Sequence, residues 1–131
     1  MREYNLFVIK KEYFELYKNR PLYLFNILKK LFYFQTNFNY GITLYEQLCN
    51  KINVIRIREY LNDKYDLKCN NLFYVDQVLI ELKPSRIILK SKMNYPRIIK
   101  SFNCYNRFIF VCDFNNDDYF WLNAVCSLQY I

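Results

Sequence analysis

Few side chains in this chain of 131 residues have the type and spacing that catalysis requires. There is no histidine, the commonest general base and metal ligand, so most hydrolase designs are disfavoured. Asp117 and Asp118 are paired carboxylates, but they follow Asn115 and Asn116 in a predicted turn, where such side chains bond their own backbone. We therefore predict that the chain is not an enzyme.

Metal and nucleotide sites find equally little support. The five cysteines are an odd set and lack the paired short spacing of zinc ligands, so we interpret them as small apolar side chains kept reduced. The single glycine, Gly41, cannot supply a phosphate-binding loop. No metal and no cofactor is expected.

One short predicted helix, residues 10–20, carries side chains that are typical of protein interfaces. Tyr13 and Tyr17 are four residues apart and share a face, and Arg20 follows one turn later. Tyr and Arg are the residues that interface hot spots favour. The same spacing also fits a buried stripe of Tyr13, Leu16 and Tyr17 with the charged residues outside, and spacing alone favours burial.

The formal charge of +7 is concentrated in one window of the chain. No acidic residue lies between Glu81 and Asp113, whereas this window holds seven basic residues, Lys83, Arg86, Lys90, Lys92, Arg97, Lys100 and Arg107. The two-residue period of a strand and the turn of a helix could merge Arg86, Lys90, Lys92, Arg97 and Lys100 into one basic patch. Such a patch suits an acidic partner, including nucleic acid. A solvated face that keeps the protein soluble is the favoured interpretation, because no nucleic-acid motif accompanies the charge.

Length and composition indicate a single compact domain spanning residues 1–131. Apolar stretches end well before the roughly 20 residues that a bilayer requires, and the start lacks an apolar signal core. We therefore expect a cytoplasmic monomer with no membrane partner.

The pattern along the chain predicts helices first and strands later. The predicted strands cover residues 3–9, 67–75, 78–83, 86–92, 108–113 and 119–122, and the predicted helices cover 10–20, 21–34, 43–52, further turns to 61, and 94–106. This order favours an α+β fold in two layers, with helices on one face of a mixed, mostly antiparallel sheet of four to five strands.

Two stretches of the chain resemble the SirA family, sporulation inhibitors of replication. The first is Leu6-Phe7-Val8-Ile9-Lys10-Lys11-Glu12-Tyr13, which continues through Phe14, Tyr17 and Arg20 and is similar to the family's opening strand and aromatic helix. The second is Phe108-Ile109-Phe110-Val111-Cys112-Asp113-Phe114-Asn115 with Tyr119-Phe120-Trp121-Leu122-Asn123, similar to the family's Phe-Asp-Phe-Asn strand and Trp-Leu-Asn ending. The chain departs from the family pattern at Tyr13, Asn19 and Ala124.

The resemblance implies a protein that inhibits the initiation of DNA replication by binding the amino-terminal domain of the initiator DnaA. It implies that the contact helix is residues 10–20, with Tyr13, Phe14, Tyr17 and Arg20 as the partner-binding residues, and it reverses the preference for burial of the tyrosines. No catalysis and no direct nucleic-acid contact is implied. The alternative is a small basic nucleic-acid-binding module that uses the window Lys83 to Arg107.

Overall fold

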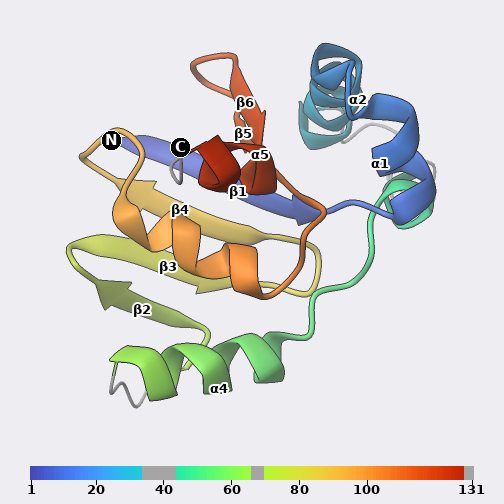
Figure 1. Cartoon of the computed structure of the whole chain (residues 1–131). Coiled ribbons are helices and arrows are strands. Elements are labelled where there is room, and N and C mark those ends of the chain that lie inside the picture. The colour runs from blue at the N-terminus through green and yellow to red at the C-terminus, as the bar shows by residue number, and fades with distance from the viewer. Residues whose placement is uncertain (34–43, 66–69, 129–131) are drawn as a thin grey trace.

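The computed structural model describes residues 1–33, 44–65 and 70–128 (Figure 1). Its elements are β1 (Arg2–Val8), α1 (Lys11–Tyr17), α2 (Pro21–Tyr33), α4 (Val54–Tyr65), β2 (Leu72–Val75), β3 (Val78–Leu82), β4 (Ile87–Ser91), the 3₁₀ helix η1 (Arg97–Cys104), β5 (Ile109–Asp113), β6 (Asp118–Trp121) and α5 (Leu122–Leu128). Residues 44–48, between α2 and α4, are also helical.

The strands form one sheet in the order β2-β3-β4-β1-β5-β6. Every neighbouring pair among these strands is antiparallel, with β1 in contact with both β4 and β5. The α+β class predicted from the sequence is confirmed. The sheet has six strands, slightly more than the four to five expected.

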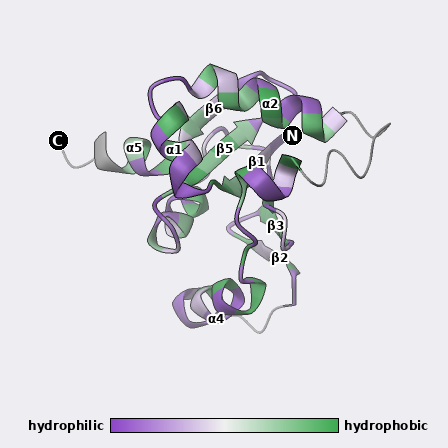
Figure 2. Ribbon diagram, turned by 90° about the vertical axis from the view of Figure 1, so that its right-hand side faces the viewer, coloured by the Kyte–Doolittle hydropathy of each residue, from purple (hydrophilic) through white to green (hydrophobic). Residues whose placement is uncertain are grey.

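Helices pack against both faces of this sheet, where the sequence predicted them on one face. Tyr4, Leu6 and Val8 of β1 lie in a first core together with residues of α4, η1 and α5. Phe7 and Ile9 point to the opposite face, into a second core that includes Leu24, Phe25 and Leu28 of α2. Successive strand residues face opposite sides of the sheet, so a largely apolar strand such as β1 or β5 must be covered by helices on both faces (Figure 2).

Several helices and turns differ from their sequence predictions. The helix predicted over residues 43–52 ends at residue 48 in the structure, so Ile52 is not part of it. Thr43, the predicted cap of this helix, is outside the described residues. The 94–106 helix is the shorter η1, and α5 was not predicted. Pro84 and Ser85 do form the turn before β4, where the Lys83 amide donates to the Arg86 carbonyl at 3.0 Å.

No helix in the described part of the chain is long and apolar enough to cross a bilayer.

The β2–β3 hairpin is closed by a two-residue turn in which both residues have positive φ. Asp76 has φ of 49° and Gln77 has φ of 67°, between the paired residues Val75 and Val78. Two positive φ values are the mark of a type I′ turn, whose twist matches that of the strands and which strongly prefers glycine at its second position. Gln77 therefore holds a conformation that is costly for a residue with a Cβ atom.

Replacing Gln77→Gly should raise the free energy of unfolding by about 0.5 to 1 kcal/mol, because the left-handed conformation costs glycine nothing. Urea denaturation of the variant and the parent measures the difference. Gln47→Gly, in the helical residues 44–48, is the control and should lower the same free energy by about 1 kcal/mol.

A charged cluster joins the beginning of β1 to the end of β5. The Arg2 guanidinium donates at 2.8 Å to Asp113 and at 2.8 Å to Asp118, and it stacks on the rings of Tyr4 and Tyr95 at 4.8 and 5.0 Å. Asp113 is only 1% exposed. The predicted turn is confirmed at residues 114–117, which include Asp117, whereas Asp118 begins β6 and its carboxylate pairs with Arg2.

The pKa of Asp113 lies below its ordinary value. Burial acts to raise this pKa, but hydrogen bonds from Arg2 and Asn116 to the carboxylate outweigh it. Because the pKa is lower in the folded chain than in the unfolded chain, the ionised carboxylate stabilises the fold above about pH 4. That contribution is lost as the pH falls from about 4 toward the folded-state pKa.

Asp113→Asn should lower the free energy of unfolding by about 3 kcal/mol at neutral pH, because Arg2 loses a buried partner. The variant should also lose less stability than the parent as the pH is lowered below about 4. Denaturant melts across a pH series measure both effects. Asp117→Asn is the matched control, since Asp117 is largely exposed beside Lys29 and should change stability by less than about 1 kcal/mol.

Candidate functional site

α1 follows the central strand directly and is set in place by backbone bonds on both sides of the junction. The Ile9 amide donates to the Phe108 carbonyl and the Lys10 amide to the Leu48 carbonyl, each at 2.9 Å. The Lys10 carbonyl then accepts the first helical bonds, from Tyr13 at 3.0 Å and Phe14 at 2.9 Å. The helix ends at Tyr17, so it is shorter than the predicted 10–20.

Phe14 anchors α1 to the body of the protein. Its ring centroid lies 4.8 Å from that of Phe108 and 4.9 Å from that of Trp121, which it meets edge-on at 87°. Edge-on aromatic pairs at this separation are favourable beyond the area they bury. Phe14 was predicted to bind a partner, and the structure places it mainly as an internal contact.

Tyr13 and Tyr17 are each partly buried and pack against the second core. By helical geometry they lie between Phe14, which faces inward, and Leu16, which faces outward and is 59% exposed. No residue of α1 is fully buried. The structure therefore lies between the two interpretations of the tyrosine spacing, a buried stripe and an exposed interface. The rings contact the core and keep a solvent-facing edge.

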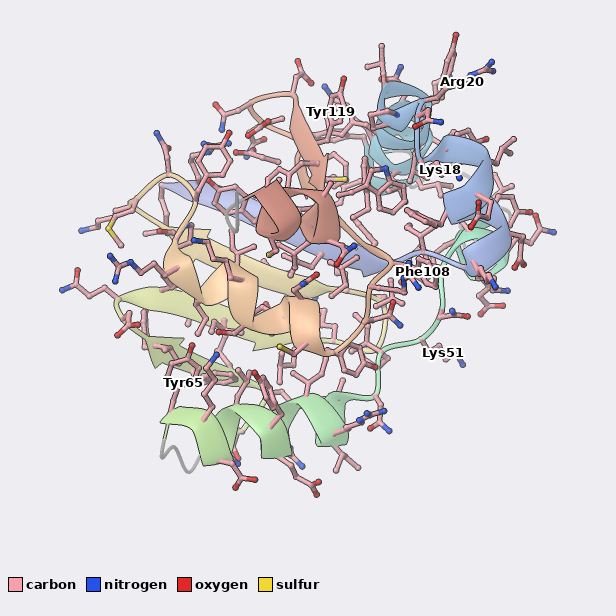
Figure 3. The ribbon with its side chains drawn as sticks, in the orientation of Figure 1. Lys18, Arg20, Lys51, Tyr65, Phe108 and Tyr119 are labelled. Atoms are coloured by element: carbon pink, nitrogen blue, oxygen red, sulfur yellow. The ribbon has the colours of Figure 1, made fainter. Side chains whose placement is uncertain are left out.

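Exposed side chains continue from α1 into the first turn of α2. Arg20 is exposed in the connection between the helices (Figure 3), where its carbonyl accepts from the Tyr23 amide at 3.2 Å. Leu22 and Tyr23 are also exposed apolar residues. Neither residue was predicted to bind a partner, although the periodicity that turns Leu24 and Leu28 inward turns both of them outward. We call Tyr13, Leu16, Tyr17, Arg20, Leu22 and Tyr23 the α1–α2 surface.

The structure does not bring the five predicted basic residues into one patch. Arg86 stacks on Phe32 of α2 at 5.1 Å, on the second-core face of the sheet. Lys90 shares that face, since its neighbour Leu89 lies in the first core, and Glu3 is directly opposite Lys90 on β1.

The remaining predicted basic residues lie elsewhere. Arg97 and Lys100 are exposed on η1, which packs over the first core, and Lys92 is exposed beyond the end of β4. The sheet therefore separates the two groups, which weakens the nucleic-acid alternative.

A pocket of about 470 Å³ lies beside the start of α1. It is lined by Lys10, Tyr45, Cys49 and Ser85 among others. Burial raises the pKa of the Cys49 thiol to about 12, so the thiolate is absent at neutral pH. Burial also raises the pKa of Tyr45, whose hydroxyl donates to the Ser85 carbonyl.

The described cysteines other than Cys49 are also free thiols. Cys112 and Cys126 are buried as expected, whereas Cys104 is exposed and Cys69 lies outside the described residues. Among the described residues no group of three metal-ligating side chains occurs.

No protein-family model matches the chain, and no curated protein matches it. The resemblance to the SirA family therefore depends on the two motif stretches alone. Both stretches contribute to the same place in the fold, because Phe14 comes from the first, and Phe108 and Trp121 from the second.

Phe14→Ala should lower the free energy of unfolding by about 2 kcal/mol, less than the 3 to 5 kcal/mol typical of a fully buried Phe, because Phe14 is only partly buried. Urea denaturation measures the loss. Leu16→Ala, on the outer side of the same helix, is the control and should change stability by less than about 0.5 kcal/mol. Equal effects of the two substitutions would contradict the anchoring role.

Proposed function

We propose that this protein is a SirA-like, non-catalytic inhibitor of replication initiation that binds the amino-terminal domain of DnaA through the α1–α2 surface. The observation that carries the proposal is that α1 has one anchored side and one exposed side. Phe14 fixes the helix against Phe108 and Trp121, while Leu16 and the outer edges of Tyr13 and Tyr17 are left for a partner.

Pre-organisation supports this use of the helix. Association is weakened by the cost of ordering side chains and loops at the interface. Tyr13 and Tyr17 are already held on their inner sides by the second core, so little side-chain freedom is left to lose. Partly buried aromatic residues with an arginine nearby are what interface hot spots favour, and Arg20 is exposed next to them.

The charge of this region favours apolar over electrostatic binding. Residues 11–20 contain three basic and two acidic side chains, a net charge of only +1. One of these acids, Glu15, already pairs with Lys18 at 3.1 Å. Most of the chain's basic excess is therefore elsewhere, and affinity for the initiator domain should depend weakly on salt. Binding to nucleic acid would instead fall steeply with salt.

Tyr17→Ala should weaken binding to the purified DnaA amino-terminal domain by about 1 to 4 kcal/mol, the range for loss of a hot-spot aromatic residue. Isothermal titration calorimetry at two salt concentrations measures the change. Tyr74→Ala is the matched control, since it removes a tyrosine that is 66% exposed at the far edge of the sheet, and it should leave affinity unchanged.

Three results would count against the proposal. They are no heat of binding with the parent protein, equal affinity for a folded Tyr17→Ala variant, and an affinity that collapses with salt. The last result, together with a gel shift on DNA, would favour the nucleic-acid alternative.

A further inference from the structure

The pocket beside the start of α1 is formed where three separate segments of the chain meet. Its lining comes from the junction of β1 and α1 (Lys10), from the segment before α4 (Tyr45, Glu46, Cys49, Lys51) and from the turn before β4 (Ser85). The Asn50 amide donates to the Val8 carbonyl at 2.8 Å. The Ile52 amide donates to the Pro84 carbonyl, also at 2.8 Å. Backbone hydrogen bonds therefore hold the three segments together around the pocket.

Two lysines line this pocket without an acidic partner among the described residues. Lys10 is partly buried, and Lys51 is exposed on the connection that leads to α4 (Figure 3). Neither lysine takes part in the ion pairs that the described residues form. Glu46 also lines the pocket, so the charged side chains of the lining sum to a net charge of +1.

Arg86 adds a third positive charge next to the pocket. Burial raises the pKa of Tyr45, and the charge of Arg86 acts in the opposite direction, so the guanidinium lies near the Tyr45 hydroxyl. The Nε atom of Arg86 is buried and has no hydrogen-bond partner among the described residues. Three basic residues and Glu46 give a local charge of +2. Cations gathered in this way attract an anion.

The pocket also has an apolar wall that is fixed in place. The ring of Tyr45 meets that of Phe7 edge-on, with centroids 6.3 Å apart, and its hydroxyl donates to the Ser85 carbonyl. Pro84 and the neutral thiol of Cys49 add further apolar surface. Ligand pockets typically have volumes of about 300 to 1,000 Å³ and combine apolar walls with a few polar groups. The volume of about 470 Å³ lies in that range.

We propose that this pocket binds a small phosphate monoester with a ring-bearing apolar body, the phosphate lying between Lys10 and Lys51 and the ring against Tyr45. A phosphate monoester carries a charge of about −1.5 to −2 at neutral pH, which matches the local charge of +2. Its oxygens accept strong hydrogen bonds from ammonium groups. A carboxylate would offset only half of the local charge. Lysine side chains hold the phosphate here, so no glycine-rich loop is required.

The pocket is distinct from the α1–α2 surface. None of the residues that define that surface lines the pocket. Ligand binding here therefore does not depend on whether the protein binds DnaA, and each proposal can fail without the other.

Isothermal titration calorimetry of the full chain tests the proposal with three probes, phenyl phosphate, benzoate and inorganic phosphate. Phenyl phosphate should bind with a dissociation constant of about 1 mM or lower. Benzoate carries a single negative charge and inorganic phosphate has no ring, so each should bind at least about fivefold more weakly. No binding of phenyl phosphate at about 10 mM would overturn the proposal, and so would equal affinity for benzoate.

Two substitutions test the lysines. Lys10→Gln and Lys51→Gln should each raise the dissociation constant for phenyl phosphate about tenfold, because each removes a charged hydrogen-bond donor. Lys11→Gln is the matched control, since it removes the same charge at the next residue, which is exposed and does not line the pocket. It should leave the constant within about twofold. Circular dichroism checks that all three variants fold.

Nuclear magnetic resonance locates the bound probe independently of any substitution. Phenyl phosphate should shift the amide signals of Asn50 and Lys51 and leave those of Asp76 and Gln77, in the β2–β3 turn, unchanged. Shifts spread over all exposed basic residues would show non-specific ion binding and would overturn the proposal. Equal loss of affinity in Lys10→Gln and Lys11→Gln would do the same.

Discussion

The fold depends on a central strand that cannot be left exposed on either side. All residues from Tyr4 to Ile9 are nearly inaccessible to solvent, and their alternation sends three of them to each face of the sheet. Antiparallel sheets often leave one face in water. This chain cannot, because β1 and β5 are apolar on both faces, and the helices are therefore divided between two cores.

The division of the helices between two cores also determines which apolar side chains remain exposed. α1 and α2 complete the second core with only part of their apolar residues, since Phe14, Leu24 and Leu28 face inward. Leu16 and Tyr23 are left on the outside of the same helices. The buried thiols of Cys49 and Cys112, whose pKa values are raised by burial, are consistent with a role in packing.

Local pattern was enough to locate most strands and the first two helices. Hydrophobic periodicity, and residues such as Pro21 and Pro84 that begin or end an element, act over a few residues. They can therefore be recognised from the sequence without knowledge of the fold. Contacts between distant residues could not be read in this way. Arg2 bonds Asp113 and Asp118 across almost the whole chain, whereas the sequence suggested only a local turn at the acids.

The sequence by itself determined the fold class, the absence of histidine chemistry, and the aromatic character of the early helix. Tertiary structure alone decided which side of that helix is available, because the partners of Phe14 are Phe108 and Trp121, roughly a hundred residues away. It also decided that Arg86 and Lys100 lie on opposite faces. Periodicity fixes the relative direction of side chains within one element, but only packing between elements fixes which direction is buried.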